Sequence, residues 1–96
     1  VDAGSVDGNH LRICSRVNGE LRQDSSTSDL IFDCETLVRY LEPRIPLKPG
    51  DIIFTGTPAG VVMGMPEDRQ CWLRDGDCVE VEIEQIGTLR NVMRRR

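Results

Sequence analysis

Apolar and polar side chains alternate from Leu11 to Val17, and this period-two pattern predicts a β-strand with one face turned toward a core. Asn18-Gly19 follows directly, and both residue types tolerate the positive φ angles that a type I′ turn demands. The next residues, Glu20 to Gln23, are therefore expected to return antiparallel to the first strand. A β-hairpin thus opens the regular part of the chain.

A second alternating stretch runs from Val79 to Ile83 and predicts another strand, which Gly87 separates from residues 88–93. The glycine indicates a further hairpin or a bulge. The polar face of this strand carries Glu80, Glu82 and Glu84. Hard divalent cations prefer carboxylate oxygens, but strict alternation with valine and isoleucine is typical of a strand whose polar face lies in water. We therefore assign these glutamates to a solvated face and predict no metal ligand among them.

Between the strands the apolar spacing changes to that of a helix. The apolar positions at spacings i, i+3, i+4 and i+7 are Cys34, Leu37, Val38 and Leu41. Asp33 is placed to cap this short helix and Pro43 to end it. We expect the helix to pack over the sheet.

Two further segments are similar in sequence. They are Leu47-Lys48-Pro49-Gly50-Asp51-Ile52-Ile53 and Leu73-Arg74-Asp75-Gly76-Asp77-Cys78-Val79. Each copy is read as a turn that leads into a strand, with the glycine supplying an unusual backbone conformation. The first copy thus predicts a short buried strand from Ile52 to Phe54. Residues 1–96 as a whole are interpreted as one β-rich domain with one short helix and no internal boundary.

Composition narrows the class of protein. The chain is 39% hydrophobic and 29% charged with a net charge of -4, which suits a folded soluble domain and argues against nucleic acid as a partner. No apolar run approaches the roughly 18 to 20 residues of a membrane span. The four cysteines form no Cys-x-x-Cys pair, and His10 is the single histidine, so no zinc site is predicted. We expect reduced thiols in a cytoplasmic protein.

The corner Thr55-Gly56-Thr57-Pro58 is the main candidate for chemistry. Gly56 permits close approach of another group, Pro58 stiffens the chain, and the hydroxyls of Thr55 and Thr57 both donate and accept hydrogen bonds. A carboxylate or carbonyl oxygen would suit this corner, although the same residues can simply build a turn. Gln23 is a second candidate, since its amide could contact a bound acid, or it could be a surface glutamine. No catalytic acid or base is assigned.

Several motifs in order resemble the C-terminal portion of the fumarylacetoacetate hydrolase family. These are Val17-Asn18-Gly19-Glu20, Arg22-Gln23, Thr27-Ser28-Asp29-Leu30-Ile31-Phe32, Leu47-x-Pro49-Gly50-Asp51, Thr55-Gly56-Thr57-Pro58-Ala59-Gly60-Val61, Gly76-Asp77-x-Val79-Glu80-Val81-Glu82-Ile83 and Ile86-Gly87-Thr88-Leu89-Arg90-Asn91. The family includes acylpyruvate hydrolases, 2-oxo-acid hydratases, isomerases and decarboxylases. The resemblance runs from about Leu11 to Val92.

This resemblance implies a mixed β-sandwich roll, a homodimer, and a small-molecule 2-oxo acid substrate. It also implies Mg²⁺, or Mn²⁺ or Ca²⁺ in its place, chelating the acid and stabilising an enolate. By the same resemblance Thr57 contacts the substrate with Gly56 beside it, and Gln23 lies near the pocket.

The metal ligands of the family, a Glu-x-Glu pair and an aspartate, lie upstream of the hairpin together with the catalytic lysine, and nothing before His10 supplies them. We therefore expect this chain alone to be inactive and to act as part of a longer enzyme. The alternative is a non-catalytic scaffold or dimerisation module derived from a truncated relative.

Overall fold

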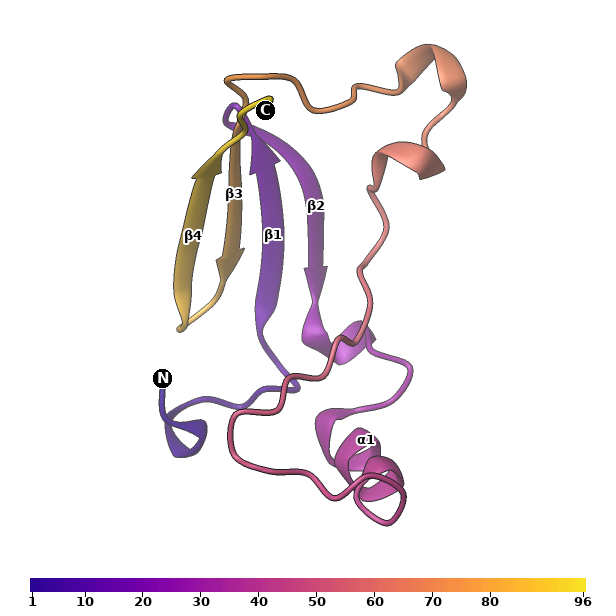
Figure 1. Ribbon diagram of the computed structural model, residues 1–96, viewed down its shortest axis with the longest axis vertical. Helices are drawn as coiled ribbons and strands as arrows, with labels where there is room; N and C mark the ends of the chain where they lie inside the picture. The colour runs from indigo at the N-terminus through magenta and orange to yellow at the C-terminus, as the bar shows by residue number, and fades with distance from the viewer.

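A single antiparallel sheet forms the centre of the computed structural model, which describes residues 1–96 (Figure 1). Its strands are β1 (Arg12–Val17), β2 (Glu20–Ser26), β3 (Cys78–Ile83) and β4 (Gly87–Val92), in the order β2-β1-β3-β4. β1 and β3 lie where alternation predicted strands, and β2 and β4 lie where the Asn18-Gly19 turn and Gly87 indicated hairpin partners. The two hairpins are thus joined through a β1–β3 pairing of residues far apart in the sequence. The predicted β-rich class with one short α-helix is confirmed.

The predicted turns adopt the backbone conformations that their residues favour. Asn18 and Gly19 have φ angles of 52° and 81°, as a type I′ hairpin requires, and β2 continues beyond Gln23 to Ser26. The two similar segments, residues 47–53 and 73–79, form the same kind of turn. Gly50 and Gly76 have φ angles of 98° and 87°, and the following aspartate in each copy accepts a hydrogen bond from the backbone amide three residues earlier, at 2.8 and 2.7 Å.

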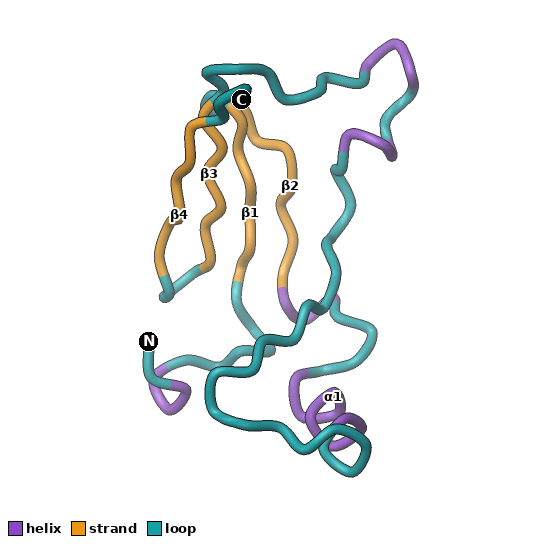
Figure 2. Tube along the Cα trace, in the orientation of Figure 1, coloured by secondary structure: helices purple, strands orange, loops and turns teal.

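The helix α1 (Cys34–Leu41) begins after Asp33, whose carboxylate accepts from the Thr36 amide at 2.7 Å. Contrary to expectation, α1 does not pack over the sheet but lies beyond its end (Figures 1 and 2). The reason is the 3₁₀ turn Thr27–Asp29, which carries the chain away from β2 before the helix starts. The other short helical turns are Ala3–Ser5, Val62–Gly64 and Glu67–Arg69. None of the helices has the length and hydrophobicity needed to span a bilayer.

The core within these residues is very small, because only Leu11 and Cys14 are fully buried. The strand expected from Ile52 to Phe54 is not formed, and this prediction is wrong for the chain by itself. Ile52 and Phe54 are 79% and 94% exposed, since no neighbouring strand pairs with this segment and nothing covers it. Figure 2 shows it as part of a long connection between α1 and β3.

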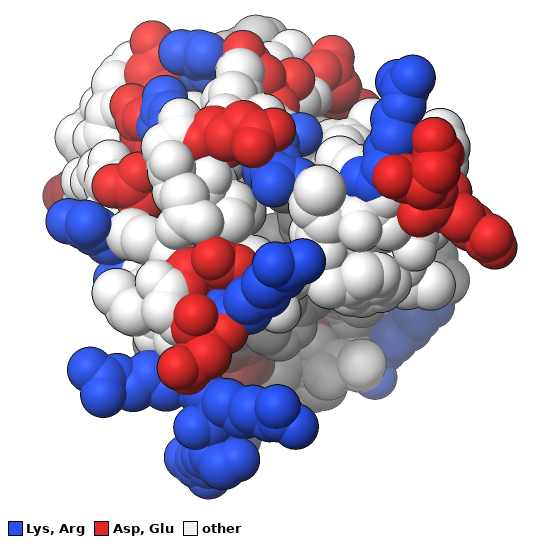
Figure 3. Space-filling view, turned by 90° about the horizontal axis from the view of Figure 1, so that it is seen from above, with Lys and Arg blue, Asp and Glu red and all other residues white.

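Charged side chains of both signs lie interspersed on the surface, as the view of one face in Figure 3 shows. The three glutamates on and beside β3 take part in this pattern. Arg16 donates to Glu82 at 2.7 Å and thereby lowers the pKa of that carboxylate, while Arg90 lies 3.9 Å from Glu80. Glu84 accepts from the Arg12 backbone amide at 3.0 Å. The glutamate face of β3, which was predicted to lie in water, therefore makes charged and polar contacts to the neighbouring strands.

Candidate functional site

The corner Thr55-Gly56-Thr57-Pro58 borders a cavity of about 270 Å³. The other wall comes from Ile13, the end of β2 and the turn that follows it, namely Ser25, Ser26, Thr27, Asp29, Leu30 and Ile31. Thr55, Gly56 and Thr57 are exposed and not packed against a core. The corner therefore has room for a ligand beside it.

Gln23 holds the corner against β2. Its side-chain Nε2 donates to the Thr57 hydroxyl oxygen at 2.8 Å and to the Pro58 carbonyl oxygen at 3.0 Å. Its Oε1 accepts from the Ser15 hydroxyl at 2.9 Å. All polar atoms of the Gln23 side chain are thus paired within the protein, so its part in this structure is to position Thr57.

Two glycines shape the corner in different ways. Gly60 has a φ angle of 106°, and a β-carbon there would overlap the Arg22 carbonyl oxygen and come within 3.0 Å of Gln23 Cγ. Only glycine lets the segment after the corner lie so close to β2. Gly56 has a φ angle of 95° with no other atom within 4 Å of its β-carbon position, so its open side is free for the approach of a ligand.

The opposite wall of the cavity is held by hydrogen bonds around Asp29. Its carboxylate accepts from the Ser25 hydroxyl at 2.7 Å and from the Ser26 amide at 3.3 Å, and the first of these bonds is the main cause of its lowered pKa. Ser26 in turn caps the 3₁₀ turn Thr27–Asp29. The carboxylate is therefore an ionised structural group that fixes the turn lining the cavity.

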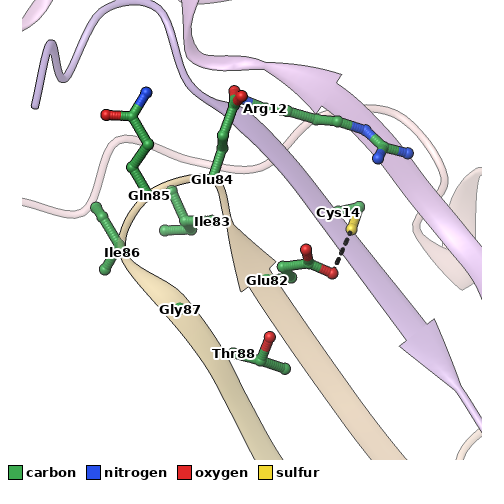
Figure 4. A pocket seen from close by; sticks show the side chains of 9 residues that line it. All are labelled: Arg12, Cys14, Glu82, Ile83, Glu84, Gln85, Ile86, Gly87 and Thr88. Atoms are coloured by element: carbon green, nitrogen blue, oxygen red, sulfur yellow. Dashed lines mark hydrogen bonds between the residues drawn. The ribbon is translucent and has the colours of Figure 1, made fainter.

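A larger cavity of about 470 Å³ lies on the other side of the sheet, below the β3–β4 turn (Figure 4). Cys14 and Glu82 face each other there, with the thiol 3.7 Å from the carboxylate. The guanidinium of Arg12 donates two hydrogen bonds, each of 2.8 Å, to the carboxylate of Asp24. The β3–β4 turn beside this cavity also has positive φ angles, 61° at Gln85 and 134° at Gly87. We favour the smaller cavity as the site because Gln23 holds the threonine corner there by two side-chain hydrogen bonds.

The described residues contain no group of three or more His, Cys, Asp or Glu side chains that could hold a metal ion. Thr55, Gly56 and Thr57 are brought together at the cavity, and Gln23 stands behind them in contact with Thr57. Sequence reasoning missed Ser15 as the partner of Gln23 and did not single out Gly60. The roles of these residues toward a substrate remain predictions.

Comparisons with known proteins agree with this architecture. The sequence profile described as fumarylacetoacetate (FAA) hydrolase C-terminal matches residues 1–94. A mitochondrial oxaloacetate tautomerase of Bos taurus is 45% identical over 86 residues, which cover 90% of this chain and 27% of that protein. The chain belongs to the fumarylacetoacetate hydrolase family.

Solved structures show the same fold over nearly the whole chain. A fumarylacetoacetate hydrolase from Exiguobacterium antarcticum matches with a TM-score of 0.92 and 41% identity, over 100% of this chain and 34% of that one. The maleylpyruvate hydrolase from Sphingobium sp. SYK-6, in complex with manganese(II) and pyruvate, matches with a TM-score of 0.81 and 33% identity, over 96% and 32%. The chain thus spans about a third or less of the length of these relatives, which are enzymes.

Proposed function

We propose that this chain is the substrate-orienting C-terminal part of a divalent-metal-dependent enzyme that acts on 2-oxo or β-diketo acids. The observation that carries the proposal is the exposed threonine corner beside a cavity, with Thr57 held by Gln23. The Thr57 hydroxyl donates to no atom of the protein, so its proton is available to an oxygen of a bound acid. The oxaloacetate tautomerase and the maleylpyruvate hydrolase among the relatives support this class of substrate.

The metal ion of such an enzyme does not fit the residues of this chain, since they form no cluster of ligands. We place its ligands in the part of the longer relatives that this chain does not span. Mg²⁺ or Mn²⁺ is the proposed cation, and the manganese in the maleylpyruvate hydrolase structure supports a divalent metal. When bound, such a cation polarises the carbonyl of a 2-oxo acid.

The contribution of this chain is a fixed hydrogen-bond donor. Cleavage of a C–C bond next to a carbonyl and tautomerisation of a 2-oxo acid both build negative charge on oxygen. A donor already oriented at that oxygen stabilises the charge without reorganising during the reaction. Thr57 meets this requirement because Gln23 and Pro58 hold it, and hydrolysis and tautomerisation could both use it.

The uncovered apolar side chains support a place inside a larger domain. Ile31, Ile52 and Phe54 are 92%, 79% and 94% exposed, which is unfavourable for side chains of this size in water. We propose that the rest of the catalytic domain covers them and that the complete protein forms a homodimer. The same exposure would also suit a non-catalytic scaffold, and that alternative predicts a protein without turnover of any 2-oxo acid.

The test is the Thr57→Val variant of the full-length protein, assayed with Mg²⁺ or Mn²⁺ against acylpyruvates and oxaloacetate. Valine keeps the shape of threonine but removes the donor, so we expect kcat/KM to fall about 10- to 100-fold, as for loss of a hydrogen bond to a charged group. Thr88→Val is the matched control, because Thr88 lines the other cavity and should leave turnover unchanged. Undiminished turnover in Thr57→Val would remove Thr57 from the site.

A further inference from the structure

The orientation of the Gln23 amide follows from its neighbours. The Pro58 carbonyl oxygen can only accept a hydrogen bond, so the amide atom 3.0 Å away must be the nitrogen. The second hydrogen on that nitrogen then points at the Thr57 hydroxyl oxygen, 2.8 Å away. The amide oxygen faces Ser15, whose hydroxyl must therefore donate to it.

A β-bulge brings Ser15 and Gln23 together. Val17 pairs with Glu20 and Arg16 with Leu21, but Ser15 pairs with Gln23, so Arg22 has no partner on β1. In an unbroken register Ser15 would lie opposite Arg22, and Gln23 would stand one position away with its side chain on the other face. Bulges commonly re-aim a side chain next to a functional site, and this one turns Gln23 toward Thr57.

The chain of bonds from Ser15 through Gln23 fixes the polarity of the Thr57 hydroxyl. Because the Thr57 oxygen accepts from Gln23, its own proton must point elsewhere, and the cavity lies beside it. A hydroxyl group is normally free to donate or to accept. Here the bond from Gln23 occupies one acceptor site of the Thr57 oxygen, and the single hydroxyl proton is left for a ligand in the cavity.

We propose that Ser15 is a positioning residue: it holds the Gln23 amide, whose orientation the Pro58 carbonyl sets, in the place from which Thr57 donates its proton into the cavity to a hydrogen-bond acceptor of the ligand. A carboxylate or carbonyl oxygen of a 2-oxo acid can accept the bond that Thr57 donates, whereas an ammonium or amide nitrogen cannot accept it. The inference rests on the proposed function, since it requires a ligand at Thr57, and it adds the reason why an oxygen atom of that ligand lies there.

The experiment is a double-mutant cycle in the full-length protein loaded with Mn²⁺, with pyruvate binding measured by calorimetry. Ser15→Ala leaves the Gln23 amide oxygen without its donor, and we expect pyruvate affinity to fall about fivefold, the effect of one hydrogen bond. In the Thr57→Val background, Ser15→Ala should have no further effect, because Ser15 acts only through the Thr57 hydroxyl. A similar loss in both backgrounds would mean a general structural role and would overturn the proposal.

Two further variants keep the test independent of folding. Ser15→Thr retains the hydroxyl on a residue that strands favour, and it should restore the pyruvate affinity of the parent protein. Gln23→Glu cannot donate to Thr57 or Pro58, so Thr57 would donate to the new carboxylate and lose its proton for pyruvate. We expect Gln23→Glu to lose more pyruvate affinity than Ser15→Ala does. If Gln23→Glu bound pyruvate as tightly as the parent protein, the proposed chain of hydrogen bonds from Ser15 through Gln23 to Thr57 would be refuted.

The outcomes separate the two proposals. If Thr57→Val weakens pyruvate binding and Ser15→Ala does not, the positioning role of Ser15 is wrong and the site at Thr57 stands. If Thr57→Val binds pyruvate as the parent protein does, the proposed function is wrong, and so is the positioning role of Ser15. Melting temperatures of all variants show whether any loss of affinity comes from unfolding.

Discussion

Replacing Gly60 with alanine in the full-length protein is expected to lower its free energy of unfolding by about 2 to 5 kcal/mol, the sum of backbone strain and overpacking. The backbone at Gly60 has a φ angle of 106°, and the added methyl group would overlap the Arg22 carbonyl oxygen. The segment would have to move away from β2, which would break the bonds from Gln23 to Thr57 and Pro58. Denaturant unfolding measures the loss of stability, and the KM for whichever 2-oxo acid the parent protein turns over should rise in the same variant.

Gly50→Ala is the control for this variant. Gly50 has a similar φ angle of 98°, but a β-carbon there would meet no atom within 4 Å. Only the left-handed backbone strain remains, so we expect a cost of about 1 to 2 kcal/mol and an unchanged KM. Equal losses of stability in the two variants would show that the close contact between Gly60 and β2 is absent in the full-length protein.

Replacing Phe54 with aspartate in the full-length protein is expected to lower its free energy of unfolding by about 3 to 5 kcal/mol or more. Phe54 is 94% exposed in this chain, yet it follows Ile52 and Ile53 in an apolar run directly before the threonine corner. If the remainder of the domain covers this run, the variant buries a carboxylate in place of an aromatic ring. Thermal unfolding followed by circular dichroism measures the effect.

The comparison variant is Phe54→Leu, which keeps an apolar side chain and should cost less than about 1.5 kcal/mol. A large difference between the two substitutions would locate Phe54 in the interior of the complete protein. An unchanged melting temperature in Phe54→Asp would show that the run faces water in the native molecule, and the proposed cover would then be wrong.

Local patterns predicted the hairpins well because the signals were local. Asn18-Gly19 favours a type I′ turn by itself, and the alternation in β3 requires no knowledge of its neighbours. The segment from Ile52 to Phe54 shows where this reasoning fails. Its composition is that of a buried strand, but a strand needs a partner for its backbone hydrogen bonds, and no strand of this chain supplies one.

In the candidate site, too, some residues could be predicted from the sequence, whereas the contacts between them could not. Thr57 and Gln23 were both singled out from the sequence, but their contact across 34 positions appears only in the folded chain. Ser15 gave no signal, because a regular hairpin register would place it opposite Arg22. A bulge depends on how the whole sheet twists and packs, so the pairing of Ser15 with Gln23 could not be read from the hairpin residues.

The sequence by itself determined the turns, the alternating strands, the capped helix and the family, since each depends on residues close together or on an ordered set of motifs. The tertiary structure decided the position of α1, the β1–β3 pairing and the donor polarity of Thr57. These depend on contacts between distant segments, and such contacts form only where packing and hydrogen bonding offset the entropy of bringing the chain together.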